Sequence, residues 1–233
     1  MKSYLVIPTY NERGNIEKLL NQVFALNIEG LNVLIVDDNS PDGTGIFVDE
    51  LKKTNPSLDV IHRKEKQGLG KAYVSGFQQA LNRGAEYILQ MDADLSHDPK
   101  YLPDFLNKIK EADVVLGSRY IKGGGVKNWN WFRRQISRFG NIYARFILGL
   151  PYKDLTGGFK CHRRVVLEKI GLDGVSSVGY NFQIEMSYKT YLAGFKIVET
   201  PIIFTERAEG KSKFDIKIMI ESFWKVFLLR FRK

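Results

Sequence analysis

Short apolar runs alternate along the first half of this chain with longer amphipathic segments. The apolar runs are 4–7, 33–36, 60–61, 87–91 and 114–116, and the amphipathic segments include 16–26, 72–82 and 99–110. Near-continuous apolar strands separated by helices indicate a parallel sheet that is covered on both faces. We therefore expect an α/β, Rossmann-like fold with a mostly parallel central sheet, helices on both faces and further amphipathic helices at the periphery.

Sheets of this type bind ligands at the carboxyl ends of their strands. Polar residues follow four of the expected strands: 8–12, Asp37 with Asp38, 92–96, and Arg119. The sequence therefore predicts one ligand site built from these four strand ends.

Asp92 and Asp94 follow the apolar run 87–91 and lie one residue apart. Side chains at this spacing along a strand face the same way, so both carboxylates can point at one ligand. Carboxylate oxygens suit a hard divalent cation. The same residues also fit a solvated turn, because Asp and Ser favour local hydrogen bonds there.

Two further acidic stretches include residues of purely local importance. Asp98 before Pro99 is typical of an ordinary helix start. Residues 39–43 read as a turn, whereas we assign Asp38 to the ligand site because its strand should lie beside the first one.

The formal net charge of +9 and the pI of 9.4 favour an anionic partner, without choosing between nucleic acid, a phospholipid surface and a phosphorylated small molecule. Cys161 is the only cysteine, which excludes an intramolecular disulfide, and no signal peptide precedes the first strand. We expect a cytoplasmic setting. No run reaches the about 18 to 20 apolar residues of a spanning helix, so we expect no integral membrane segment.

After a glycine loop at 123–125, which we expect to be mobile, the character of the chain changes. Residues 129–150 carry four arginines and no acid among many aromatic side chains, which suits the headgroup layer of an anionic membrane. Residues 215–233 have the period of an amphipathic helix. We expect a main domain at 1–205, with the interfacial region 126–150 inside it, and a closing loop with a membrane-surface helix at 206–233.

Other motifs fail in detail. Residues 68–71 lack the third glycine of a dinucleotide fingerprint, residues 210–212 lack the first glycine of a P-loop, and the three histidines have no zinc spacing. Among the cations, Arg133 shares a helix face with Ser137, and the segment from Arg207 to Lys213 suits a loop that closes over phosphates.

The motifs together resemble one family. The motifs are VIPTYNE at 6–12, VDDNSPDGT at 36–44, GLGKA at 68–72, DADLSH at 92–97, GSRY at 117–120 and TGGFK at 156–160. They cover nearly the whole chain and are similar, in this order, to the polyprenol (dolichol) phosphate mannosyltransferases, which are inverting glycosyltransferases of GT-A fold.

This resemblance implies GDP-mannose as the donor and assigns roles residue by residue. It makes Asp94 a ligand of Mg2+ or Mn2+, with Ser96 at a position where many relatives have a metal-binding glutamine, so that a water or His97 could complete the coordination. It implies that Arg119, Arg207 and Lys213 bind the phosphates of the donor. The implied nucleotide contacts are Pro8, Tyr10, Glu12, Val36, Asp38, Asp92 and Ala93.

The implied reaction is one in-line displacement with inversion, in which a polyprenyl or dolichyl phosphate attacks the sugar. A lipid phosphate is already an anion and needs no general base, so catalysis reduces to positioning and charge stabilisation. We expect Asp92, Asp94 and Arg119 to act on the donor, and Arg133 and Ser137 to hold the acceptor phosphate. The protein would lie on the inner face of an anionic membrane, and a partner protein could anchor it there.

Three alternatives stay open. The same acidic motifs serve transferases that use UDP-glucose or another UDP-sugar. A nucleic-acid-binding protein would explain the basic charge but leaves the acids unexplained, so we expect no nucleic-acid partner. A scaffold with a degenerate site has only Ser96 in its favour.

Overall fold

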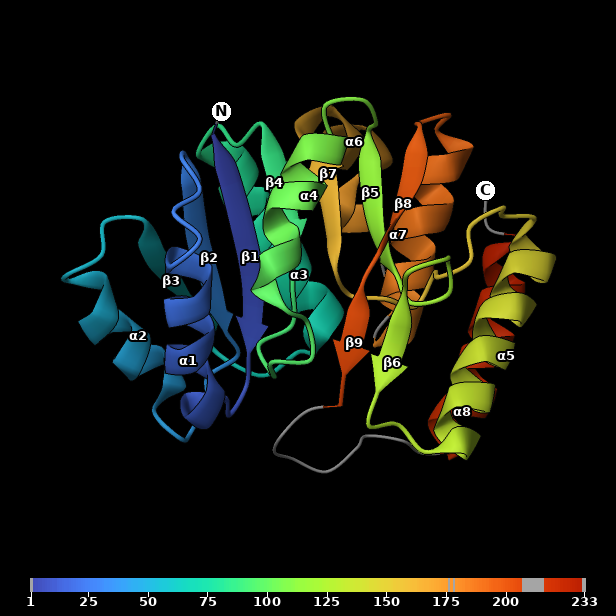
Figure 1. Ribbon diagram of the computed structural model, residues 1–233, viewed down its shortest axis with the longest axis horizontal. Helices are drawn as coiled ribbons and strands as arrows, with labels where there is room; N and C mark the ends of the chain where they lie inside the picture. The colour runs from blue at the N-terminus through green and yellow to red at the C-terminus, as the bar shows by residue number, and fades with distance from the viewer. Residues whose placement is uncertain (1, 176, 178, 207–215, 232–233) are drawn as a thin grey trace.

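The computed structural model describes residues 2–175, 177, 179–206 and 216–231. Seven strands form one sheet in the order β3-β2-β1-β4-β7-β5-β8 (Figure 1). All pairings are parallel except those of β7, which runs antiparallel to β4 and β5. The expected mostly parallel sheet is therefore confirmed. The strands are β1 Ser3–Thr9, β2 Leu31–Asp37, β3 Leu58–His62, β4 Tyr87–Gln90, β5 Val114–Ser118, β7 Lys160–Arg163 and β8 Ile197–Pro201.

Helices cover both faces of this sheet because its central parallel strands, such as β1 and β2, are apolar on both sides. One core joins the sheet to α1 (Arg13–Phe24), α2 (Thr44–Lys52) and α4 (Leu102–Lys108). The other core joins it to α3 (Leu69–Asn82), α6 (Arg164–Ile170) and α7 (Tyr180–Leu192). The helices expected at 16–26, 72–82 and 99–110 are present, the last beginning with a 3-10 turn at Pro99–Tyr101.

The two expected amphipathic helices lie together outside this sandwich. Helix α5 (Trp131–Leu148) packs on α8 (Ile216–Leu229), and both pack on α7 through a third apolar cluster (Figure 1). Tyr143 fixes the contact, since its hydroxyl donates to the Phe223 carbonyl at 3.0 Å. None of the helices that the structure describes is long and apolar enough to span a bilayer.

The glycine loop is more ordered than we expected. Gly125 begins a short strand, β6 (Gly125–Lys127), which pairs with β9 (Ile203–Thr205) as a separate parallel ribbon. The Gly125 N–H donates to the Ile202 carbonyl at 3.0 Å. Expecting a mobile loop was wrong for this residue, because glycine composition alone cannot show the pairing of distant chain segments.

A layer of buried polar side chains lies between β4, β7 and α7. The Lys160 ammonium donates to the Gln183 carbonyl at 2.7 Å and to Ser187 Oγ at 3.0 Å. Burial lowers the pKa of Lys160 to about 7, although the Asp154 charge opposes the change. Gln90 bonds both Gln183 and the Gly158 carbonyl, so this layer fixes the loop that enters β7.

Candidate functional site

The four predicted strand ends meet at one edge of the sheet, because β1, β2, β4 and β5 run in the same direction. Strand β7 runs the opposite way, so the segment 154–159 that precedes it starts from this same edge. The edge is the lower one in Figure 1.

Asp92 is held at the end of β4 by a buried tyrosine and a buried histidine. Tyr73 donates its hydroxyl to Asp92 Oδ1 at 2.9 Å, while the Asp92 N–H donates to His97 Nδ1 at 3.3 Å. Burial raises the pKa of Tyr73, as does the Asp92 charge, so this hydroxyl stays a donor. Burial also lowers the pKa of His97, although the Asp92 and Asp94 charges oppose it. The Asp92 carboxylate is still 30% exposed and therefore accessible to a ligand.

Asp94 is oriented by its own turn. Its Oδ1 accepts hydrogen bonds from the Ser96 N–H at 3.1 Å and from the Ser96 hydroxyl at 2.5 Å. Between them, Leu95 has a φ of +61°, an uncommon conformation for a leucine. Ser96 is only 1% exposed, so its hydroxyl fixes the carboxylate of Asp94 in this structure, and its role as a metal ligand stays a prediction.

The donor chemistry of this turn fits a hard divalent cation. Asp92 and Asp94 offer carboxylate oxygens, the ligand type that Mg2+ and Mn2+ prefer. Among the described residues, no three His, Cys, Asp or Glu side chains gather as a ready-made metal site. Mg2+ is commonly held by one or two carboxylates together with substrate phosphates, so an incomplete protein cage is no obstacle.

At the end of β2 the two neighbouring acids have different partners. Asp37 is used locally, since it accepts hydrogen bonds from Thr9 and from Ser40. Asp38 forms an ion pair with Arg63, a residue that the sequence did not single out. The turn expected at 39–43 is present, because Asn39 has a φ of +58° and Gly43 one of +80°.

The other predicted nucleotide contacts lie along the same edge. Pro8 and Val36 are register partners in β1 and β2 and are buried. Tyr10 is half-buried, with the Lys66 ammonium 3.6 Å from its ring centroid. Glu12 accepts a hydrogen bond from Asn15, and Ala93 is 3% exposed.

Arg119, at the end of β5, is locked into a buried bidentate ion pair. Its Nε and NH2 donate to the two oxygens of Asp154 at 2.7 Å each, and its backbone N–H adds a third bond to the same carboxylate. Burial alone would raise the pKa of Asp154, but the Arg119 charge and hydrogen bonds hold it below its usual value. The rings of Tyr120, Trp129 and Phe204 surround the guanidinium with centroids at 5.4 to 5.6 Å.

The predicted acceptor residues lie at the start of α5. Arg133 forms an ion pair with Glu206 and stacks on Trp129 at 4.4 Å from the ring. Ser137 lies one turn further and accepts a hydrogen bond from Tyr120 at 2.7 Å. Arg207 and Lys213 lie outside the described residues.

The segment 154–158 was missed as part of the site. Gly158 lies against the acidic turn, by which we mean residues 92–96, because a Cβ at this glycine would be 3.0 Å from Asp92 Oδ2. In the same segment, Asp154 binds Arg119. The segment thus touches both the acidic and the basic part of the site. The glycine pair at 157–158 was a signal for such a close approach.

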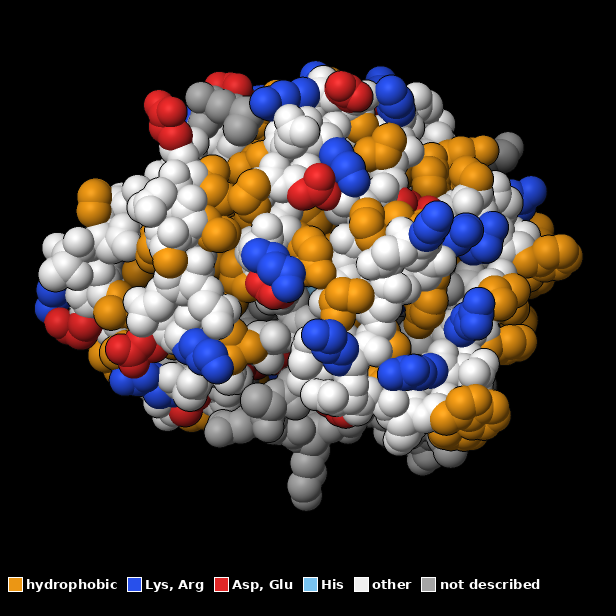
Figure 2. All heavy atoms as spheres, viewed as in Figure 1, with side chains coloured by type: hydrophobic (Ala, Val, Ile, Leu, Met, Phe, Trp, Pro, Cys, Tyr) orange, Lys and Arg blue, Asp and Glu red, His pale blue; other side chains and the backbone are white. Residues whose placement is uncertain are grey.

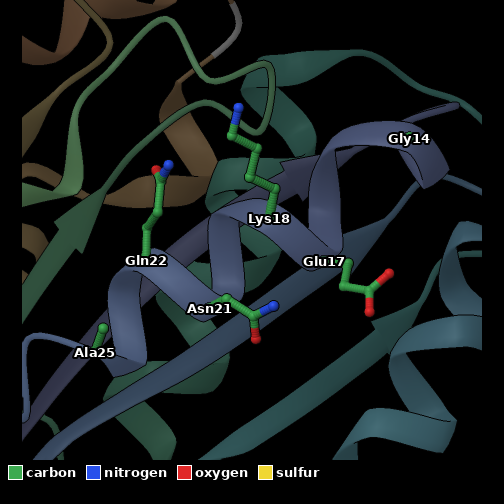
Figure 3. A pocket seen from close by; sticks show the side chains of 6 residues that line it. All are labelled: Gly14, Glu17, Lys18, Asn21, Gln22 and Ala25. Carbon is green, nitrogen blue, oxygen red and sulfur yellow. The ribbon is translucent and has the colours of Figure 1, made fainter.

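A hollow of about 500 Å³ lies elsewhere, on the outer face of α1 (Figure 3). Its charged side chains, Glu17 and Lys18, are exposed to solvent. None of its lining residues belongs to the predicted site: Gly14, Glu17, Lys18, Asn21, Gln22 and Ala25.

A mostly parallel sheet with an acid pair at a central strand end is the architecture of a GT-A glycosyltransferase. The chain belongs to glycosyl transferase family 2, whose model matches residues 4–171. It is therefore a glycosyltransferase.

Two curated relatives cover most of the chain. A polyprenol monophosphomannose synthase of Mycolicibacterium smegmatis is 45% identical over 188 residues, which are 80% of this chain and 71% of the relative. An undecaprenyl-phosphate mannosyltransferase of Micrococcus luteus is 43% identical over 187 residues, 80% of this chain and 76% of the relative.

Solved structures share the fold at lower identity. A glucosyl-3-phosphoglycerate synthase from Mycobacterium tuberculosis, with Mn2+ and UDP, has a TM-score of 0.67 at 15% identity, covering 98% of this chain and 78% of that one. A mannosyltransferase from Pyrobaculum calidifontis, with GDP-Man and Mn2+, has a TM-score of 0.63 at 19% identity, covering 91% and 58%.

The Asp154→Asn substitution should leave the buried Arg119 charge without its counter-ion and cost about 3 to 5 kcal/mol of unfolding free energy. Urea denaturation at neutral pH measures this loss. The matched control is Glu168→Gln, which removes the partner of Arg164 from an ion pair whose side chains are 41% and 46% exposed, and should cost at most about 1 kcal/mol.

The sign of the pH dependence provides a second readout. Because the pKa of Asp154 is lower in the folded chain, its contribution is complete above about pH 4 and is lost as the pH falls through the folded pKa. The stability difference between the wild type and Asp154→Asn should therefore shrink in acid. Equal costs for the two substitutions at neutral pH would show that the Arg119 pair contributes no more than a surface pair.

Proposed function

We propose that this protein transfers mannose from GDP-mannose to a polyprenyl phosphate with inversion, giving a polyprenyl phosphate β-mannose. The observation that carries the proposal is the identity of 43 to 45% to two enzymes named for mannose transfer to polyprenyl phosphates. A fold relative bound to GDP-Man and Mn2+ supports the choice of donor.

The acidic turn is the proposed donor site. Asp94, with Asp92 beside it, would hold Mg2+ or Mn2+, and the bound ion would neutralise charge on the departing diphosphate. Tyr73 and Ser96 hold these two carboxylates in place before any ligand arrives. Arg119, together with Arg207 and Lys213, is proposed to contact the donor phosphates, and Asp38 the nucleoside.

The acceptor side is proposed to be the start of α5. Arg133 now pairs with the Glu206 carboxylate, so an acceptor phosphate could take the place of that anion. Ser137 lies one helical turn away and would add a hydroxyl contact. The phosphate oxygen then attacks the anomeric carbon without a general base, because it already carries the negative charge.

A membrane surface is proposed to meet the exposed faces of α5 and α8. Apolar side chains gather at the right edge of the molecule, where α5 lies, with basic side chains beside them (Figure 2). Phe146 is 85% exposed and Trp131 is 71% exposed, and Arg134 and Arg138 are also exposed. Aromatic rings at the interface and arginines on headgroup phosphates are the expected contacts. In this proposal, residues 1–205 form the transferase domain and 206–233 the membrane-surface segment.

Incubation with labelled GDP-mannose, polyprenyl phosphate and Mg2+ or Mn2+ should move label into the organic phase. Asp94→Ala should lower the rate by about 100-fold or more, because it removes charge stabilisation from the leaving diphosphate. The matched control is Asp98→Ala, which removes a carboxylate of the same segment that caps the next turn and pairs with the exposed Lys100. This variant should stay active.

The same assay separates the alternatives. Transfer from UDP-glucose in preference to GDP-mannose, with UDP inhibiting better than GDP, would contradict the proposed donor. The proposed type of reaction, sugar transfer to a polyprenyl phosphate, would still hold. An α-linked lipid product would contradict inversion, and the absence of transfer from any nucleotide sugar would contradict the proposed function.

Co-sedimentation with anionic vesicles should show binding at low salt that weakens as salt is added, since exposed arginines are screened. Phe146→Ser should reduce the bound fraction. Ile46→Ser is the control, because Ile46 is 71% exposed on α2, at the opposite end of the molecule (Figure 1). Recovery of the wild type wholly in the unbound fraction would contradict a membrane-facing α5.

A further inference from the structure

Helix α5 has few buried anchors. Of its 18 residues only Asn141, Ala144 and Leu148 are buried, and none of the residues 131–140 is. Asn141 is thus the first buried residue along the helix and its only buried polar one. The proposed acceptor residues Arg133 and Ser137 belong to the part of the helix without a buried anchor.

Three of the four hydrogen bonds of the Asn141 side chain go to the loop that enters β7. Its Oδ1 accepts from the Leu155 N–H at 2.7 Å and the Thr156 N–H at 3.3 Å. Its Nδ2 donates to Thr156 Oγ1 at 3.0 Å and to the Ser137 carbonyl at 2.9 Å. Two donors and two acceptor sites are the full inventory of an Asn side chain. Asn141 therefore clamps α5 to residues 155–156.

The same threonine oxygen also holds Arg119. Thr156 Oγ1 accepts from Arg119 NH2 at 2.7 Å, on the side of the guanidinium that also meets Asp154. A second link runs from Tyr120, the next residue in the chain, to Ser137 Oγ. Ser137 and Asn141 are four residues apart and so face the same side of α5. Two adjacent turns of α5 are thus tied to Arg119 and its neighbour.

We propose that Thr156 and Asn141 are positioning residues that couple the placement of α5 to the orientation of Arg119, so that seating α5 on a lipid surface sets this guanidinium for the donor diphosphate. The inference rests on the proposed function for the role of Arg119 and deepens it. It assigns to two residues outside the predicted site a task in the reaction.

The chemistry of the link makes it suitable for such coupling. The guanidinium is planar with fixed N–H directions, so the Asp154 carboxylate and the Thr156 oxygen set its orientation together, and a shift of the Thr156 oxygen changes the balance at NH2. The link joins two buried side chains, Arg119 and Asn141, through the partly buried Thr156 hydroxyl. An unmade hydrogen bond at a buried group is costly, so the members of the link move together. A small misplacement of a charged group at a reacting centre is enough to slow catalysis strongly.

Thr156→Val and Thr156→Ser form a matched pair. Valine keeps the shape and removes the shared oxygen, whereas serine keeps the oxygen. With acceptor in anionic vesicles, Thr156→Val should lower kcat by about tenfold or more with a smaller change in the KM for GDP-mannose, because the error lies in orientation. Thr156→Ser should retain most of the wild-type kcat. Equal kcat values for the two variants would overturn the proposal.

Hydrogen exchange tests the coupling without any sugar transfer. Anionic vesicles should slow exchange in wild-type α5 and also at the amides of Arg119, Leu155 and Thr156, which bond Asp154 and Asn141. In Thr156→Val the vesicles should protect α5 but no longer Arg119. Protection confined to α5 and α8 in the wild type, or no vesicle binding, would overturn the coupling. Either result leaves the transferase activity to its own assay.

Discussion

The structure around the candidate site depends on the buried ion pair between Arg119 and Asp154. Arg119 ends β5, and Asp154 begins the segment that leads into β7, beside the acidic turn of β4. A charge that is 7% exposed is tolerable only with a well-placed counter-ion, and the bidentate geometry supplies one. The pair fixes the Arg119 guanidinium at the edge of the sheet, between the proposed donor side and the proposed acceptor side of the site.

On the other side of the site, local turns determine which acids face a ligand. The carboxylates of Asp37 and Asp42 accept local hydrogen bonds that stabilise the turn after β2, and Asp98 caps a 3-10 turn. At the end of β4, Asp92 Oδ1 accepts a hydrogen bond from Tyr73, and Asp94 Oδ1 accepts one from Ser96. Carboxylates that are oriented before binding need little reorganisation when a cation and a diphosphate arrive.

Much of this architecture was predictable because its signals are local. The alternation of apolar runs with amphipathic segments predicted the sheet, its two helical layers and the strand ends at which Asp92 and Arg119 lie. Strand β7 was not predicted, since its residues 160–163 are mostly polar and its pairing with β4 and β5 depends on distant segments. The partners Asp154 and Arg63 were missed for the same reason, because sequence spacing does not show which charges meet across a fold. The ordering of Gly125 in β6 likewise depends on Ile202, far along the chain.

The acid pair at the end of β4 is the proposed holder of the nucleotide diphosphate through a divalent cation. Calorimetric titration of GDP into the protein, with Mn2+ and without it, measures this. Binding should be at least about tenfold tighter with Mn2+, and Asp94→Ala should abolish that difference, a change of about 1.4 kcal/mol or more. GDP affinity that is the same with and without Mn2+ in the wild type would contradict a cation bridge at these carboxylates.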